Sequence, residues 1–207
     1  MEKDLEIDPQ KFFCLRISRP APWDIEGLDR IKSEVQSRLI TLIDGKENYE
    51  TVSQRYQEGF LINGKGTAKR TSLSKRDYTR VFDWSFRPKI DYICCMGKID
   101  APLEALVHSA IYDLDPIINS IIYLQGKNLD TENITKLNMD KTDYGTSKMV
   151  QEFSRIYQET NLKEEKVFSL TGEKEGIISF GKNPREAEQI LLSYFLHKNL
   201  KERKNRK

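Results

Sequence analysis

Histidine is scarce in this chain, which has only His108 and His197 among its 207 residues. Two imidazoles cannot supply the three protein ligands that a catalytic zinc ion takes when histidines alone hold it. A three-histidine metal centre within the chain is therefore excluded, and we expect neither a bound metal nor a cofactor.

Cysteine and long apolar segments are also sparse. The three cysteines, Cys14, Cys94 and Cys95, are odd in number and two are adjacent, which suits a reducing compartment better than a disulfide framework. No apolar run approaches the roughly 20 residues that span a bilayer, and the charged segment 1–4 is unlike a signal peptide. We expect a cytoplasmic protein with no membrane partner.

Neither sign of charge dominates. The 34 basic and 32 acidic residues are well mixed and leave a net charge of +2. This balance does not indicate a protein that binds nucleic acid. The one notable basic run, 201–207, is expected to be a solvated tail. A weak contact with an anionic polymer or membrane is the alternative for that tail.

Apolar and aromatic residues are abundant enough for one folded domain. Hydrophobic residues make up 38% of the chain, with nine Phe and nine Tyr, so global disorder is not expected. No repeat or low-complexity linker divides the sequence. We expect a single domain over 1–207, with an N-terminal extension over 1–22 and the basic tail at its end.

Helical and strand periodicities alternate along the chain. The β-branched run 117–124 is typical of a central strand, and Asn183 followed by Pro184 and Glu186 is the clearest helix start. The polar stretch 126–143 is expected to be a loop. Two helices are expected to begin at Asp24 and at Asp100, and a third to span 146–160. Further strands are expected at 11–18, 51–56, 58–63, 92–96, 167–170 and 176–180. This pattern predicts a mixed sheet covered by helices.

An ordered set of short motifs resembles the class II aldolase and adducin head family. Residues 102–112 (PLEALVHSAIY) are similar to the Pro-Ser-Ser-Glu, Leu-His and Ile-Tyr series of that family, and 115–122 to the apolar strand that follows it. Similar segments occur in the same order at 51–55, 60–66, 73–77, 144–146 and 176–181, so the resemblance covers about residues 28–200.

The resemblance implies a three-layer α/β/α fold with a mixed, largely antiparallel central sheet. It also implies a homo-oligomer, because the family forms ring tetramers whose active sites lie between subunits.

The histidines that bind metal in this family are missing from the matching positions. Family aldolases hold a divalent ion, usually zinc, with three histidines, two of them in a His-x-His at the end of the apolar strand. Tyr123 and Gln125 take those two positions here, and Glu175 takes the third. Phenol, amide and carboxylate therefore replace three imidazoles, and we expect no metal site.

The features that recognise phosphate in the family are also altered. Its Gly-Asn pair becomes Glu50-Thr51, which places a carboxylate beside the phosphate position and would repel the ligand. The hydroxyl pair before the catalytic glutamate becomes Pro102-Leu103.

One loop could supply a replacement anion site. Asn63, Lys65, Gly66 and Thr67 form a flexible segment with a cation and several backbone amides. A plain surface turn is the alternative, because Gly-Lys-Gly sequences are common in turns.

Glu104 matches the catalytic acid/base of the family, and His108 follows four residues later on the same helix face. The two could form an acid/base dyad in a pocket, or a partly buried pair retained for packing and capping. The segment between Leu124 and Tyr144 is shorter than in family enzymes. Its loss should open one wall of the site and admit water.

Three functions are compatible with these residues. The first, which we take as the main hypothesis, is a non-catalytic class II aldolase-like protein with a binding or scaffold role. The second is a metal-independent lyase, isomerase or dehydratase acting on a small sugar phosphate or aldehyde. Glu104 would then be its acid/base, Lys65 or Arg55 its anion clamp, and Tyr123 a proton donor. The third is an adducin-like module that binds other proteins.

Overall fold

The computed structural model describes residues 13–19, 32, 49–70, 72–87, 90–126, 129, 131, 134–140, 145–172 and 175–205. Within these ranges the chain forms a nine-stranded sheet in the order β1-β5-β4-β3-β2-β6-β9-β8-β7. The strands are β1 (Phe13–Ile17), β2 (Tyr49–Tyr56), β3 (Gly59–Asn63), β4 (Tyr78–Arg87), β5 (Ile90–Gly97), β6 (Ser120–Gln125), β7 (Thr135–Met139), β8 (Val167–Gly172) and β9 (Gly176–Gly181). The helices are α2 (Ala105–Tyr112), α3 (Ser147–Glu159), α4 (Leu162–Glu165) and α5 (Pro184–Asn205), with a 3-10 turn at Lys75–Asp77.

The sheet is mixed and largely antiparallel, as predicted. Among the described strands, β1 pairs with β5 and β7 with β8 in parallel. The other six neighbouring pairs are antiparallel.

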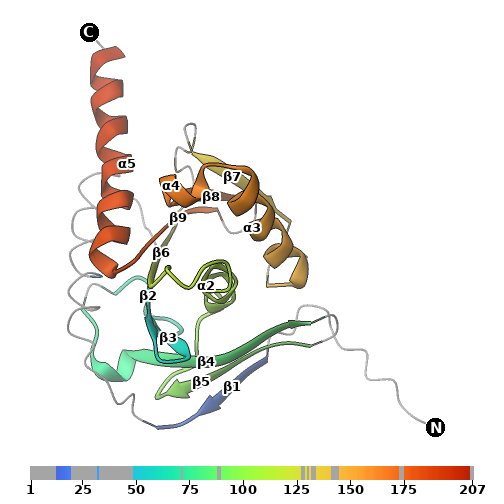
Figure 1. Cartoon of the computed structure of the whole chain (residues 1–207). Coiled ribbons are helices and arrows are strands. Elements are labelled where there is room, and N and C mark those ends of the chain that lie inside the picture. The colour runs from blue at the N-terminus through green and yellow to red at the C-terminus, as the bar shows by residue number, and fades with distance from the viewer. Residues whose placement is uncertain are drawn as a thin grey trace.

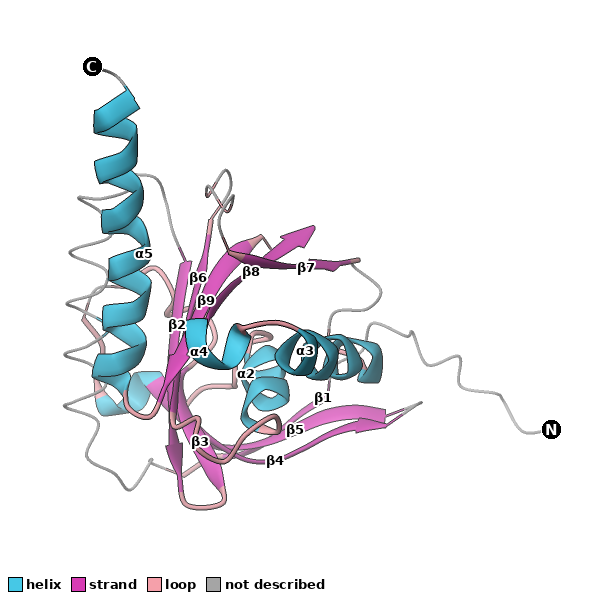
Figure 2. Cartoon of the chain, turned by 45° about the horizontal axis from the view of Figure 1, so that its top comes forward, coloured by secondary structure: helices cyan, strands magenta, loops and turns pink. Residues whose placement is uncertain are grey.

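Helices cover both faces of the sheet, which confirms the predicted three layers. Helices α2, α3 and α4 lie on one face and α5 lies on the other (Figures 1 and 2). Each face buries its own apolar cluster: Leu106 and Phe153 belong to the cluster beneath α2 and α3, and Leu191 belongs to the cluster beneath α5. Within the described part of the chain, no helix is both long and apolar enough to cross a membrane.

Strand β6 lies at the centre of the fold between β2 and β9. Successive side chains on a strand point to opposite faces, so Ile121 and Tyr123 join the cluster beneath α2 while Ile122 and Leu124 join the cluster beneath α5. Burial on both faces explains the continuous apolar run that the sequence shows here.

Helix α2 is buried along its whole length. All eight of its residues are shielded from solvent, because the helix lies between the sheet and α3 (Figure 2). A helix enclosed on every side carries apolar residues all round, and its polar members must then find protein partners. This requirement determines the surroundings of His108.

Three expectations differ from the structure. The expected loop 126–143 contains strand β7, whose alternate residues Leu137 and Met139 are buried, so a short alternating strand was hidden in a polar stretch. Helix α2 begins at Ala105 rather than at Asp100. Ile117 lies outside β6 and is 69% exposed. The helix expected from Asp24 lies outside the described residues, apart from Lys32.

Candidate functional site

His108 is the centre of a buried polar network that joins α2 to β2. Its Nε2 lies 3.1 Å from Thr51 Oγ1, and its Nδ1 lies 2.6 Å from Ser53 Oγ. Thr51 and Ser53 are two residues apart on β2, so both hydroxyls point toward the helix. The His108 and Ser53 side chains are fully buried. The histidine therefore fastens α2 to the sheet at two points.

Tyr112 and Arg55 extend this network to the end of α2. The Tyr112 hydroxyl lies 2.8 Å from Ser53 Oγ, and the Arg55 guanidinium lies 4.6 Å from the centre of the Tyr112 ring. Arg55 Nε donates to the Ile118 carbonyl at 2.9 Å, and Nη2 donates to the Tyr112 carbonyl at 2.9 Å. These carbonyls lie at and beyond the C-terminal end of the helix, where a cation is favourable. The residue expected as an anion clamp thus stabilises a helix end.

The imidazole of His108 is neutral at ordinary pH. Burial lowers its pKa to about 3, because the charged ring would lose its hydration. A neutral ring donates at one nitrogen and accepts at the other. If Tyr112 donates to Ser53 and Ser53 donates to Nδ1, then Nε2–H donates to Thr51, and every ring nitrogen is satisfied. A histidine held in this way does not exchange protons near pH 7.

Glu104 lies at the N-cap position of α2 and is half-buried, but its side chain makes no capping hydrogen bond. The two ring nitrogens of His108 are already engaged by Thr51 and Ser53. The expected Glu104–His108 pair is therefore replaced by a pair of hydroxyls from β2. A role for Glu104 as an acid or base remains a prediction.

The side chains of Asn63 and Thr67 hold their own loop together. Both are buried, and Asn63 Oδ1 accepts the Val52 amide at 2.7 Å while its Nδ2 donates to Thr67 Oγ1 at 3.0 Å. Thr67 Oγ1 in turn donates to the Gly64 carbonyl at 2.7 Å. These groups stabilise the end of β3, and their hydrogen-bonding capacity is largely used inside the protein.

The backbone between them forms a tight turn. The Thr67 amide donates to the Gly64 carbonyl at 3.2 Å, and Gly66 has a φ of +81°, which suits the third residue of a type II turn. The Lys65 amide donates to the Asp100 carbonyl at 2.9 Å. Two amides that could have cradled an anion therefore already have acceptors, and the exposed Lys65 side chain and the Gly66 amide are left as candidates for anion contact.

The three positions that match the family's metal ligands do meet in the fold. Gln125 and Gly176 are partners in the pairing of β6 with β9, and the Gly126 amide donates to the Glu175 carbonyl at 3.2 Å. Gln125 Nε2 donates to the Tyr123 hydroxyl at 3.3 Å. The three residues therefore lie near one another, and their chemistry can be judged together.

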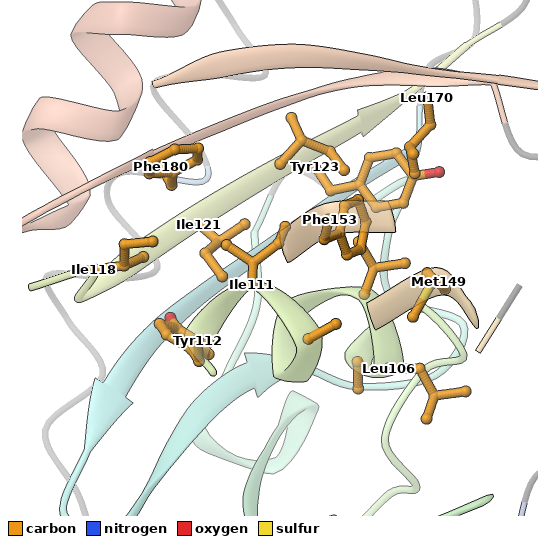
Figure 3. Close-up of a cluster of buried hydrophobic side chains, with 14 of the residues drawn as sticks. Leu106, Ile111, Tyr112, Ile118, Ile121, Tyr123, Met149, Phe153, Leu170 and Phe180 are labelled. Carbon is orange, nitrogen blue, oxygen red and sulfur yellow. The ribbon is translucent and has the colours of Figure 1, made fainter. Parts of the chain in front are cut away.

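These side chains do not fit a transition-metal ion. Tyr123 is fully buried in the apolar cluster, with Phe153 and Leu170 nearby in Figure 3. Its ring also passes close to Gly176, where an added Cβ would lie 2.5 Å from Tyr123 Cε2. Glu175 is exposed. Among the described residues, no group of three or more His, Cys, Asp or Glu side chains is placed to hold a metal.

Tyr123 is shielded from solvent although the segment after β6 is short. Tyr123 has no exposed surface, and Met149 and Phe153 of α3 are completely or almost completely buried on the same side of the sheet (Figure 3). Met149 and Phe153 share one apolar cluster with Tyr123. The opening expected from the shortened segment stays a prediction, because 127–128, 130, 132–133 and 141–144 lie outside the described residues.

Glu50 faces the opposite side of the sheet from His108, because it precedes Thr51 on β2. Burial raises the pKa of Glu50 to about 8; Lys32 opposes this effect and Glu188 of α5 adds to it. Neither carboxylate oxygen has a hydrogen-bond partner within the described part of the chain. The Glu50 carboxylate therefore lies in the layer of α5, and its effect on a phosphate ligand stays a prediction.

Replacing Glu50 with Gln should change how stability depends on pH. The folded pKa of about 8 lies above the ordinary value of 4.5, so the folded carboxyl keeps a proton that the unfolded chain releases. The stability of the parent should therefore fall as the pH rises through this window, and Glu50→Gln should flatten that fall. Thermal unfolding from about pH 5 to about pH 9 tests this, with the exposed Glu175→Gln as control. Parallel profiles for the parent and Glu50→Gln would contradict it.

The sequence did not single out Thr51, Ser53 or Tyr112 as members of a site. The sequence does place Thr51, Ser53 and Arg55 at alternate positions of one expected strand, so that their polar side chains would lie on the same face. Tyr112 lies four residues after His108, on the same side of α2. The sequence does not indicate which helix packs against that face of the strand.

Solved structures show which fold this is. The chain matches YgbL, a putative aldolase/epimerase/decarboxylase from Escherichia coli, at a TM-score of 0.59 and 15% identity, over 84% of this chain and 86% of that one. YgbL from Klebsiella pneumoniae gives the same values. An aldolase II superfamily protein from Pseudomonas syringae matches at a TM-score of 0.54 and 15% identity, over 88% of this chain and 76% of that one. No protein-family model and no curated protein matches the chain. The chain has the class II aldolase fold.

Proposed function

We propose that this chain uses the class II aldolase fold as a non-catalytic binding or scaffold protein. The observation that carries the proposal is the complete burial of Tyr123 at the position of a metal ligand. A catalytic metal needs three fixed ligands and an open coordination position for substrate. An aromatic ring packed into the core offers neither.

The other side chains considered for catalysis support the same proposal. His108 is neutral and bonded at both ring nitrogens, so it is not free to move a proton. Arg55 is engaged with the end of α2. Two of the four side chains proposed for a metal-independent lyase or isomerase, Arg55 and Tyr123, are thus committed to structure, and Glu104 and Lys65 are left as its candidates. We therefore place this activity second.

One observation favours an adducin-like interaction role within the same proposal. Strand β1 lies at an edge of the described sheet, and its residues Leu15 and Ile17 are 59% and 44% exposed. Edge strands with apolar side chains are ready sites for pairing with another chain. A homo-oligomer and a cytoplasmic location remain parts of the proposal.

Metal analysis tests the proposal directly. Protein purified with zinc present and then passed through a desalting column should retain well under about 0.1 zinc per chain, because phenol, amide and one exposed carboxylate bind zinc weakly. Inductively coupled plasma mass spectrometry measures the content, and manganese should be absent too. Glu175→Ala should give the same result as the parent.

About one tightly held zinc or manganese per chain would overturn the proposal. If Glu175→Ala then lost that metal, the ion would be assigned to the positions of Tyr123, Gln125 and Glu175.

A further inference from the structure

Two of the three cysteines lie next to each other although they are 81 residues apart in the sequence. Strands β1 and β5 pair in parallel, with Cys14 opposite Ile93, so Cys95 is two residues further along β5 and on the same face. The two sulfur atoms are 3.2 Å apart, and both cysteines are free. This distance is within hydrogen-bonding range for thiols.

The two thiols differ in accessibility and in charge. Cys14 is half-buried on the edge strand, whereas Cys95 is fully buried. The hydrogen bond between the two sulfur atoms lowers the pKa of Cys95 to about 6, against the opposing effect of burial. The same hydrogen bond, together with burial, raises the pKa of Cys14. The hydrogen bond thus favours a negative charge on Cys95 and the proton on Cys14, and a thiolate is the reactive form of a cysteine.

Cys94 supplies a built-in comparison. It precedes Cys95 on β5 and so points to the opposite face of the sheet. Burial and the neighbouring Asp83 raise its pKa, so it stays a thiol. The chain thus has one paired and one unpaired position on the same strand.

We propose that Cys14 and Cys95 are a redox-active pair that forms a reversible disulfide by exchange with small-molecule disulfides. The half-buried Cys14 sulfur attacks one sulfur of the external disulfide, gives its proton to the Cys95 thiolate and releases one external thiolate. That thiolate takes the proton back from Cys95, whose sulfur then attacks Cys14 and releases the second external thiolate. Overall, one external disulfide is reduced to a thiol and a thiolate as the internal disulfide forms.

The disulfide would fasten the exposed edge of the sheet. Strand β1 pairs with β5 alone among the described strands, and its Arg16–Asp100 ion pair, at 2.7 Å, is between two exposed side chains. Exposed ion pairs contribute little to stability. A covalent link from Cys14 to Cys95 would hold β1, with its exposed Leu15 and Ile17, against the sheet. Reversible disulfides of this kind occur in reducing compartments mainly as sensors.

The test uses the complete folded chain, incubated in mixtures of reduced and oxidised glutathione of increasing oxidising strength and then alkylated. Intact-mass spectrometry should show the loss of two hydrogen atoms, and non-reducing peptide mapping should link Cys14 to Cys95. Dithiothreitol should restore both thiols. Oxidation should raise the thermal midpoint by roughly 5–15 °C, since it closes a long loop.

Variants separate this reaction from general thiol oxidation. Cys94→Ser should behave like the parent. Cys14→Ser and Cys95→Ala should both form no internal link, and Cys95→Ala, which lacks the proton acceptor, should take up glutathione on Cys14 more slowly than the parent forms its internal disulfide. The inference would be overturned if the folded parent kept all its thiols, carried glutathione without an internal link, or linked Cys94 instead. The result on the parent decides alone if a variant fails to fold.

Discussion

His108→Ala should lower the free energy of unfolding by about 3–5 kcal/mol, one of the largest effects of any single change in this protein. The substitution removes a fully buried ring, takes the imidazole partner from the Thr51 hydroxyl and leaves the Ser53 hydroxyl with Tyr112 alone. An orphaned buried hydroxyl costs about 1–3 kcal/mol, and the cavity adds to that. Urea unfolding followed by circular dichroism measures the change.

The matched control for this variant is Ile117→Ala. Ile117 follows α2 closely in the sequence but is 69% exposed, so its truncation should change stability by less than about 0.5 kcal/mol. If His108→Ala cost as little as Ile117→Ala, His108 would not hold α2 to β2. A small loss of stability is the result expected for a solvent-accessible histidine in an open catalytic pocket.

The effect of His108 should also depend on pH. The pKa of His108 in the folded chain, about 3, lies below its ordinary value of 6.5. Between these two pH values the unfolded chain therefore binds a proton at His108 and the folded chain does not. The stability from the neutral ring is fully present above pH 6.5 and is lost as the pH falls toward 3. The difference between the parent and His108→Ala should therefore shrink in acid.

Tyr123→Ala should cost about 3–5 kcal/mol, whereas Tyr123→Phe should cost only about 1 kcal/mol. The first variant empties the space of a fully buried ring beside Phe153, and the second removes the hydroxyl that accepts from Gln125. Truncation inside a close-packed cluster leaves a cavity that neighbouring side chains fill only in part. Equilibrium unfolding of the three proteins gives both differences.

This pair of variants separates packing from chemistry. A proton donor in an open site would tolerate truncation with little loss of stability and would fail equally in both variants in any activity assay. Equal stability for Tyr123→Ala and the parent would therefore contradict a filled site. A large loss for Tyr123→Phe would show that the hydroxyl, rather than the ring, is the part that matters.

The sequence predicted the fold well where the residue pattern of a segment indicates on which faces that segment is buried. The β-branched run in 117–124 required a strand buried on both faces, and β6 has that position. The order of short motifs gave the three layers and brought Tyr123, Gln125 and Glu175 to one place. Strand β7 was missed because its alternation covers only Thr135–Met139, within a polar stretch.

The sequence could not predict features that depend on which elements meet. The pairing of His108 with Thr51 and Ser53 depends on how α2 lies across β2, and helix spacing alone suggested Glu104 instead. The approach of Cys14 to Cys95 depends on the pairing of β1 with β5. Burial of Tyr123 depends on α3, which no residue near Tyr123 in the sequence reveals.

The most direct test of a filled ligand site is a crystal structure determined in excess zinc, with anomalous diffraction data collected at the zinc edge. We predict that the Tyr123 ring will remain packed beside Phe153 and that no anomalous peak will lie within bonding distance of Tyr123, Gln125 or Glu175. An ordered zinc ion bound by those three side chains would contradict the proposed loss of metal-dependent catalysis.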